Sequence, residues 1–322
     1  MHHQQTRRQF LHTAIGLSAC AAAGAATDAA SSGGVYDGPV IDTHTHFYDP
    51  DRAQGVPWPP KDDKLLYRRV LPSDYRALPQ PQAVTATVVV EASPWLEDNQ
   101  WILDLAAREP FIAGFVGNLS GVSADFKTNL LRFAANPLFR GIRIGSDRIK
   151  RGLADRQFID ELKLLADHDL AVDLLGGVAM LPDVDRIARA VPNLRLVIDH
   201  VANIPIDGKP VDPAWRDGMD AAGQHPGVYC KVSGLVEGTG RTDGQAPHNP
   251  EFYQPVLDTL WSRFGADRLV YGSNWPVSER FAPCVVVQQI VRDYFNRKSR
   301  AAAEKVLFQN SRGAYKWIQR RG

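Results

Sequence analysis

Short apolar runs alternate with stretches of helical periodicity along most of this 322-residue chain, and no other feature constrains its fold as strongly. We expect strands over residues 40–44, 85–90, 111–116, 139–144, 170–175, 194–198, 228–232 and 269–271. These runs are apolar along their length, which is typical of strands in a parallel sheet that is covered on both faces.

The stretches between the runs have the spacing of amphipathic helices. Within residues 251–264, for example, Phe252, Val256 and Leu260 fall on one stripe. We expect helices over residues 99–108, 125–135, 158–168, 183–190 and 251–264. Strands that alternate with helices indicate βαβ units, and eight such units fit a single-domain (β/α)8 TIM barrel of the α/β class. A doubly wound sheet is the alternative, but the chain lacks the G-x-G-x-x-G fingerprint after its first expected strand.

The first thirty residues differ in composition from the rest of the chain. Arg7 and Arg8 precede an alanine-rich run over residues 14–26, which is too short to span a bilayer comfortably and ends in small residues. This pattern predicts a signal peptide, and the paired arginines are typical of twin-arginine export, whereas an amphipathic N-terminal helix is the alternative. We therefore expect a signal peptide over residues 1–30, a linker over residues 31–38 and the barrel over residues 39–322. The mature protein would be periplasmic or secreted, without a membrane anchor.

The charge balance argues against polyanionic partners. The chain has 37 basic and 36 acidic residues and a formal net charge of +1, so no overall field attracts nucleic acid. We expect a small-molecule substrate as the partner, and a homo-oligomer stays open. Cys230 and Cys284 lie outside the signal segment and in no C-x-x-C pair. They form either a disulfide or two buried thiols.

Three histidines follow expected strands. His44 and His46 come at the end of the first run, and residues two apart in an extended segment point to the same side. His200 ends the sixth run, and catalytic residues of barrels collect at the carboxyl ends of strands. Imidazole is a common ligand of zinc and similar ions. The spacing therefore predicts that His44, His46 and His200 converge on one site that can hold a metal.

Four motifs in order carry a family resemblance, namely IDTHTHFYDP from Ile41, VIDHVA from Val197, VSGL from Val232 and YGSNWPVS from Tyr271. On these motifs the chain resembles the amidohydrolase-related TIM-barrel family, which includes sugar-lactone and dicarboxylate-lactone hydrolases. The resemblance implies a distorted TIM barrel that hydrolyses a cyclic ester, or sometimes an amide or related bond. It also implies a divalent metal, with zinc expected, although some relatives work without one.

One position departs from the family pattern. The family usually reads G-S-D-W-P after the eighth strand, and here Asn274 replaces the aspartate that takes a proton from water. An amide oxygen accepts hydrogen bonds but takes no proton near neutral pH. Glu91, at the end of the second run, is the candidate substitute in a catalytic set with His200 and Asn274. A salt bridge of Glu91 with Arg143 or Lys231 is the alternative.

Further side chains near strand ends are candidates for substrate binding. Arg143 on the fourth run can clamp a carboxylate or polarise a lactone carbonyl. Each of the others can equally be packing inside the barrel; they are Asp173, Lys231, Ser233 and Trp275. The loop over residues 48–71, which contains Trp58, is long enough to act as a lid.

These features favour a metal-dependent hydrolase in which activated water attacks the carbonyl of a small lactone. A metal-free lactone isomerase or hydrolase is one alternative. A periplasmic binding protein that lost catalysis with Asn274 is the other, and it predicts affinity without turnover.

Overall fold

The computed structural model describes residues 34–119 and 125–320, and in them the chain forms a parallel eight-stranded sheet whose strands follow one another in chain order. The strands are β1 (Val40–Thr45), β2 (Val84–Val90), β3 (Ile112–Gly117), β4 (Phe139–Gly145), β5 (Ala171–Leu175), β6 (Arg195–Ile198), β7 (Val228–Val232) and β8 (Leu269–Tyr271). All eight expected strands are confirmed, and the sheet curls into a nearly closed (β/α)8 barrel. The expected signal peptide and the first residues of the linker lie outside the described residues.

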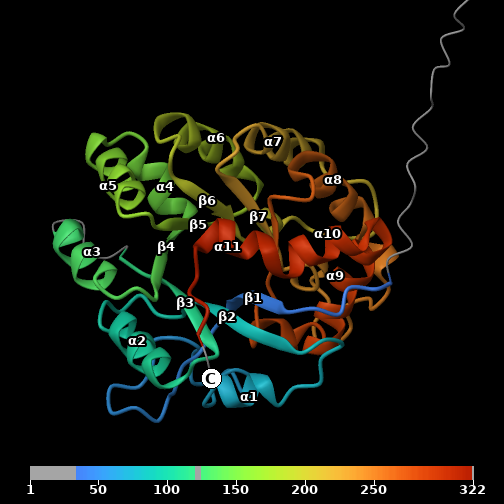
Figure 1. Cartoon of the computed structure of the whole chain (residues 1–322), viewed down its shortest axis with the longest axis horizontal. Helices are drawn as coiled ribbons and strands as arrows, with labels where there is room; N and C mark the ends of the chain where they lie inside the picture. Colours follow the sequence, from blue (N-terminus) through green and yellow to red (C-terminus); the bar gives the residue numbers. More distant parts are fainter. Residues whose placement is uncertain (1–33, 120–124, 321–322) are drawn as a thin grey trace, which may run out of the picture. The chain divides into compact units, whose positions relative to one another are not determined.

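Helices surround the strands (Figure 1). They are α1 (Pro72–Arg76), α2 (Asp98–Arg108), α3 (Phe126–Ala134), α4 (Ser146–Gly152), α5 (Arg156–Asp167), α6 (Leu181–Ala190), α7 (Pro213–Gly223), α8 (Gln254–Phe264), α9 (Cys284–Lys298), α10 (Arg300–Glu304) and α11 (Asn310–Tyr315). The five expected helices correspond to α2, α3, α5, α6 and α8. Each buries an apolar stripe; in α8 this stripe includes Val256, Leu257 and Leu260. No helix within the described ranges is long and apolar enough to cross a membrane.

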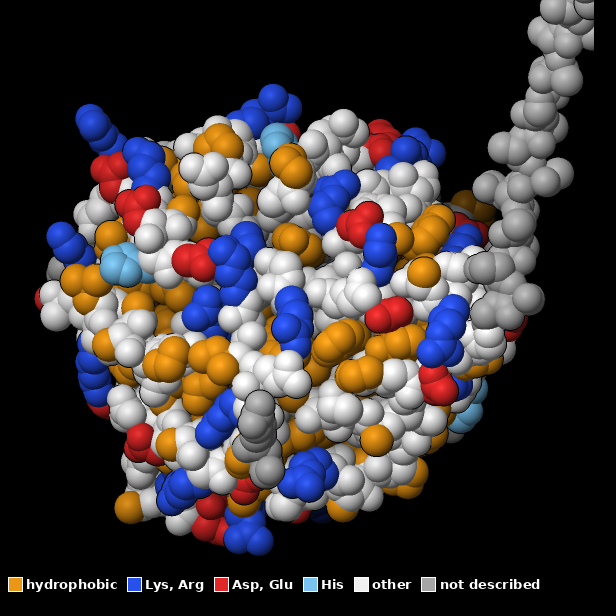
Figure 2. All heavy atoms as spheres, viewed as in Figure 1, with side chains coloured by type: hydrophobic (Ala, Val, Ile, Leu, Met, Phe, Trp, Pro, Cys, Tyr) orange, Lys and Arg blue, Asp and Glu red, His pale blue; other side chains and the backbone are white. Residues whose placement is uncertain are grey.

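The C-terminal segment fills the end of the barrel at which the strands begin. Ala314 and Tyr315 pack with Ile41, Ala113 and Val270 in one buried cluster, and α11 crosses the middle of the ring of strands in Figure 1. The face of the molecule in this view carries interspersed basic and acidic side chains (Figure 2). The carboxyl ends of the strands lie at the opposite end of the barrel, and the side chains predicted for the site are found there.

The segment after β8 completes the ring between β8 and β1. The Asn274 amide donates a hydrogen bond to the His44 carbonyl at 2.8 Å, and the His46 amide donates to the Trp275 carbonyl at 2.9 Å. These bonds form a parallel bridge between Thr45 and Trp275. Closure of the barrel therefore brings Asn274 next to the histidine pair.

Candidate active site

The three predicted histidines meet at the mouth of the barrel. His44 lies in β1 and His46 directly after it, and their ring centroids are 4.9 Å apart. The ring of His200, which follows β6, lies 4.3 Å from that of His44. His44 is fully enclosed, and His46 and His200 retain only 4% and 6% exposure. The structure thus brings together the residues that the spacing predicted.

His200 is presented by an unusual backbone turn. His200, Val201, Ala202 and Asn203 have φ values of 51°, 47°, 55° and 45°. This left-handed conformation costs roughly 1–2 kcal/mol for each residue that has a Cβ. Two side-chain hydrogen bonds support the turn, from Trp215 Nε1 to the Val201 carbonyl at 2.8 Å and from Asn203 Nδ2 to the Gly176 carbonyl at 3.2 Å. Such strain persists where surrounding contacts enforce it, often at functional sites.

A charged network lies beneath the imidazoles. Lys231 Nζ is 2.7 Å from Asp173 Oδ2, 2.9 Å from Asp199 Oδ1 and 3.0 Å from His44 Nδ1. The Tyr315 hydroxyl donates to Asp173 Oδ1 at 2.9 Å. Burial opposes the charge of Lys231, but the two carboxylates keep the pKa of Lys231 above its ordinary value. Asp173 and Lys231, predicted to bind substrate, are therefore enclosed and support His44 from below.

All three imidazoles are neutral near pH 7. Burial, together with the charge of Arg143, lowers the pKa of His46 to about 3. Burial lowers the pKa of His200 to about 4, with Lys231 and Arg143 adding to the effect. The pKa of His44 is held well below its ordinary value by burial and by Lys231. A neutral imidazole keeps one lone pair, which can bind a metal or accept a proton.

Among the residues that the structure describes, one group of side chains could hold a metal ion. The ligand atoms of His44, Asp199 and His200 lie within 4.8 Å of one another. His44 Nε2 is buried and has no hydrogen-bond partner among the described residues, which is unusual for a buried polar atom. Nitrogen and carboxylate donors of this kind suit zinc. His46, the third predicted ligand, instead directs Nε2 at Asn274 Oδ1, 3.2 Å away.

The structure adds Asp199 to the predicted set. The sequence carried a signal for it, because Asp199 directly precedes His200 at the end of the sixth run. Burial raises the pKa of a carboxyl group, but the charge of Lys231 and the hydrogen bond from His44 outweigh it and hold the pKa of Asp199 well below its ordinary value. Asp199 is therefore a carboxylate, the form that binds metals.

Glu91 and Arg143 form an ion pair at the mouth. Arg143 Nε donates to Glu91 Oε1 at 2.9 Å, and Arg143 Nη2 donates to the Glu91 carbonyl at 2.7 Å. The sequence left open whether Glu91 is the substitute base or a salt-bridge partner, and the structure contains the salt bridge. The carboxylate holds the guanidinium of Arg143 in place.

Asn274 contacts a carboxyl group that the sequence analysis did not single out. Asn274 Nδ2 donates to Glu237 Oε1 at 2.9 Å. Burial raises the pKa of Glu237 to about 7. The available signal was weak: Glu237 is the acidic residue of the segment between Ser233 and Arg241, directly after β7.

Two further predicted residues have defined places. Ser233 Oγ lies 2.9 Å from His200 Nδ1, so it orients that ring. Trp275 is buried against Phe47 and Tyr75, and its Nε1 donates to Glu279 Oε1 at 2.7 Å. The Trp275 side chain therefore fills the core beside the site. Cys230 and Cys284 are both buried free thiols.

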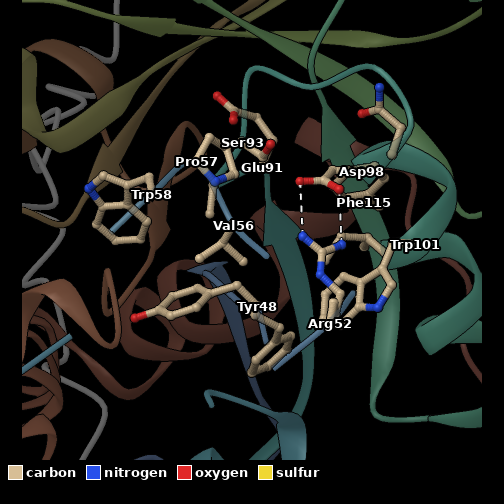
Figure 3. A pocket seen from close by; sticks show the side chains of 14 residues that line it. Tyr48, Arg52, Val56, Pro57, Trp58, Glu91, Ser93, Asp98, Trp101 and Phe115 are labelled. Atoms are coloured by element: carbon tan, nitrogen blue, oxygen red, sulfur yellow. Dashed lines mark hydrogen bonds and ion pairs between the residues drawn. The ribbon is translucent and has the colours of Figure 1, made fainter. Parts of the chain in front are cut away.

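The loop between β1 and α1 covers one side of the site. Tyr48 and Val70 pair at its base through two backbone hydrogen bonds. Arg52 donates to both oxygens of Asp98, at 2.9 and 3.2 Å, and the ring of Trp58 lies 6.0 Å from that of His46. Figure 3 shows the pocket beneath this loop, with Trp58 and Glu91 among its walls. The loop thus covers His46 on the side where Glu91 lies.

Comparison with known families agrees with this geometry. The model of the amidohydrolase family matches residues 41–317, which include every histidine of the site and Asn274. The chain belongs to the amidohydrolase family. Hydrolysis is therefore its class of reaction.

Three relatives of this amidohydrolase indicate the range of its neighbours. It is 37% identical to an L-fucono-1,5-lactonase of Burkholderia ambifaria over 74% of this chain and 80% of the relative. It is 28% identical to an L-fucono-1,5-lactonase of Burkholderia multivorans over 83% and 92%. A crystal structure of a zinc-bound amidohydrolase from Burkholderia multivorans is 26% identical, with a TM-score of 0.74 over 87% of this chain and 100% of that one.

Proposed function

We propose that this amidohydrolase opens a small cyclic ester, and that the ester is the 1,5-lactone of a sugar acid. The observation that carries the hydrolytic part is the convergence of three neutral imidazoles beside the guanidinium of Arg143 at the mouth of the barrel. The lactone part is supported by the two relatives named L-fucono-1,5-lactonase.

The residues at the mouth have separate tasks in ester hydrolysis. Arg143, held by Glu91, can donate hydrogen bonds to the lactone carbonyl and to the oxyanion that forms when water attacks. His200 can donate its Nδ1–H to Ser233 and offer its one remaining lone pair to a divalent ion. The loop with Trp58 shields the carbonyl from bulk solvent, which strengthens these interactions.

His44, Asp199 and His200 would hold a divalent ion, and we propose zinc. A bound zinc ion polarises a carbonyl and lowers the pKa of water. His44 offers Nε2 only when its proton sits on Nδ1, facing Asp199 Oδ1 at 3.5 Å. Lys231 would then direct its N–H groups at Asp173 and Asp199.

A lactone panel tests the activity. Sugar 1,5-lactones, 1,4-lactones and dicarboxylate lactones are offered in weak buffer, and the proton released on ring opening is followed with an indicator. We expect turnover of a sugar 1,5-lactone and a loss of about 10²–10⁴-fold in kcat/KM for His200→Asn. His248→Asn is the control, because His248 is exposed and has no role in the site. Binding without turnover would favour the alternative of a binding protein.

Elemental analysis tests the metal. We expect close to one divalent ion per chain, most of it lost in His44→Ala and none lost in His248→Asn. Full lactone turnover after exhaustive chelation would favour the metal-free alternative.

We also propose export to the periplasm, supported by Arg7, Arg8 and the apolar run behind them. Replacing both arginines by lysine should leave the full-length precursor in the cytoplasm on cell fractionation. Normal export of that variant would contradict the proposal.

A further inference from the structure

We infer that Glu237 is the catalytic carboxylate of this site, supplying from the loop after β7 the proton acceptor that Asn274 cannot provide. The inference rests on the proposed lactone hydrolysis. It concerns the atom to which the attacking water gives its proton.

The backbone carries the segment of Glu237 past His200. Gly234 follows β7 with a φ of 68°, and a Cβ at this residue would lie 2.5 Å from His200 Cβ. The segment therefore passes in direct contact with His200. Three residues later it forms a short 3-10 helix, Glu237–Thr239, and the Glu237 carboxyl reaches Asn274. Asn274 in turn is next to His46.

The hydrogen-bond chain through Asn274 calls for a proton on Glu237. His46 Nδ1 faces the Val90 carbonyl at 2.9 Å, so Nδ1 carries the hydrogen and Nε2 can only accept. As drawn, the Asn274 amide donates to Glu237, and its oxygen faces this acceptor nitrogen at 3.2 Å. If the side-chain amide of Asn274 is flipped, its NH2 group can donate to His46 Nε2. Its oxygen then faces the Glu237 carboxylate, and two acceptors meet. Every contact is satisfied only once Glu237 has accepted a proton and donates it to the amide oxygen, so the chain stabilises the proton that Glu237 takes from water.

The other carboxylates near the imidazoles are committed to cations or to protein donors. Asp42 has no cation in the part of the chain that the structure describes, but it accepts hydrogen bonds from the Tyr75 hydroxyl and from the backbone amides of His44 and Ser273. Glu91 pairs with Arg143, and Asp173 and Asp199 pair with Lys231. Glu237 has no ion pair among the described residues. Its Oε2 is enclosed and has no hydrogen-bond partner there, so its lone pairs face no donor of the protein. Burial without a cation is also why the pKa of Glu237 is raised to about 7, where a carboxylate is an effective base.

The reaction balances with Glu237 as the single proton carrier. A water oxygen forms a bond to the lactone carbonyl carbon, and one water proton passes to the Glu237 carboxylate. The oxyanion then collapses, and the bond between the carbonyl carbon and the ring oxygen breaks. Glu237 returns the proton to the ring oxygen, which leaves as a hydroxyl group. The product is a hydroxy acid, and its carboxyl proton goes to solvent.

A carboxylate exchange tests the inference in the full chain. Glu237→Gln should lose about 10²–10⁴-fold in kcat with little change in KM, because a general base acts in the transition state. Asn274→Asp alone places two carboxyls where an amide and a carboxylate are now 2.9 Å apart. One of the two carboxyls must then hold a proton. Activity at neutral pH should therefore fall, and the pH at which activity rises should shift to a more alkaline value.

The double variant, Glu237→Gln with Asn274→Asp, reverses this hydrogen bond while it conserves charge. It should regain at least about tenfold of the activity that Glu237→Gln loses, because a carboxylate is again at the site. Glu251→Gln is the control, because Glu251 is exposed and pairs with Arg297 on the surface. It should leave kcat and KM unchanged.

The outcomes separate this inference from the proposed function. A wild type that opens no lactone refutes the function. Lactone turnover that survives Glu237→Gln, or a double variant no better than Glu237→Gln, overturns the inference. Carbon NMR of protein labelled at the glutamate carboxyl carbon gives a readout without substrate. The Glu237 resonance is the one that disappears in Glu237→Gln, and it should titrate with a pKa near 7. Titration of that resonance at the ordinary 4.5 would also overturn the inference.

Discussion

At the scale of single residues, the division of labour among carboxylates depends on which cation each one meets. Glu91 accepts from Arg143 Nε at 2.9 Å, and this pair is only 14% and 13% exposed. Glu237 meets the neutral amide of Asn274. A carboxylate held by a guanidinium favours its charged form, whereas one buried without a cation favours its protonated form. Two glutamates that are chemically identical in the sequence thus differ in protonation in the folded site.

We predict that Glu91→Gln weakens substrate binding more than it slows the chemical step. The glutamine oxygen still accepts from Arg143, but the ion pair is lost, so the guanidinium is held less firmly. KM for the accepted lactone should rise by about tenfold, with kcat reduced less. Steady-state kinetics measure both. A loss confined to kcat would identify Glu91 as a base after all.

At the scale of elements, the site depends on two irregular segments that follow strands. The turn Asp199–Asn203 after β6 keeps four residues in a left-handed conformation and thereby aims His200. The segment after β7 can press on His200 because Gly234 has no side chain. The regular strands carry the site, and these segments set its geometry.

We predict that Gly234→Ala disturbs His200 and lowers kcat/KM by at least about tenfold, because its Cβ would lie 2.5 Å from His200 Cβ. Gly240→Ala is a matched control, since Gly240 has a φ of 65° and nothing within 4 Å of an added Cβ. Both variants share the backbone strain, and only Gly234→Ala adds the clash. Equal kinetics for the two would show that the contact with His200 has no catalytic consequence.

At the scale of the whole molecule, the buried ionisable groups couple stability to pH. On folding, the pKa values of His46 and His200 fall from the ordinary 6.5 to about 3 and about 4. The unfolded chain therefore binds more protons below pH 6.5, and their contribution to stability is lost as pH falls. Glu237 acts in the opposite sense, because its pKa rises from 4.5 to about 7. Asp42 and Asp173, whose pKa values burial also raises, act in the same sense as Glu237. Lys231 limits the rise at Asp173, and we expect the three histidines to outweigh these carboxyls.

We predict that the metal-free protein loses stability between pH 7 and pH 4. The contribution of His200 alone is up to about 3 kcal/mol, since one pKa unit corresponds to about 1.4 kcal/mol. Thermal midpoints measured with a chelator present should fall across this range in the wild type and fall less in His200→Asn. A midpoint that is flat or rises toward acid would contradict this balance.

The sequence by itself determined the barrel and the histidine site. Strands that are buried on both faces are apolar along their length, and helices that are buried on one face are amphipathic. Both patterns can be read from the residue types of a short segment. The convergence of His44 and His46 follows from the two-residue period of a strand. The position of His200 follows from the rule that parallel strands end at the same edge of a sheet.

Only the tertiary structure decided which partner each polar group meets. Glu237 contacts Asn274, which is 37 residues away in the sequence. Lys231 contacts Asp173 across 58 residues, and Glu91 contacts Arg143 across 52. Such contacts depend on the register of neighbouring strands and on turns as irregular as Asp199–Asn203. Hydrogen bonds are short and directional, so a local pattern that predicts a strand cannot predict which side chain faces it.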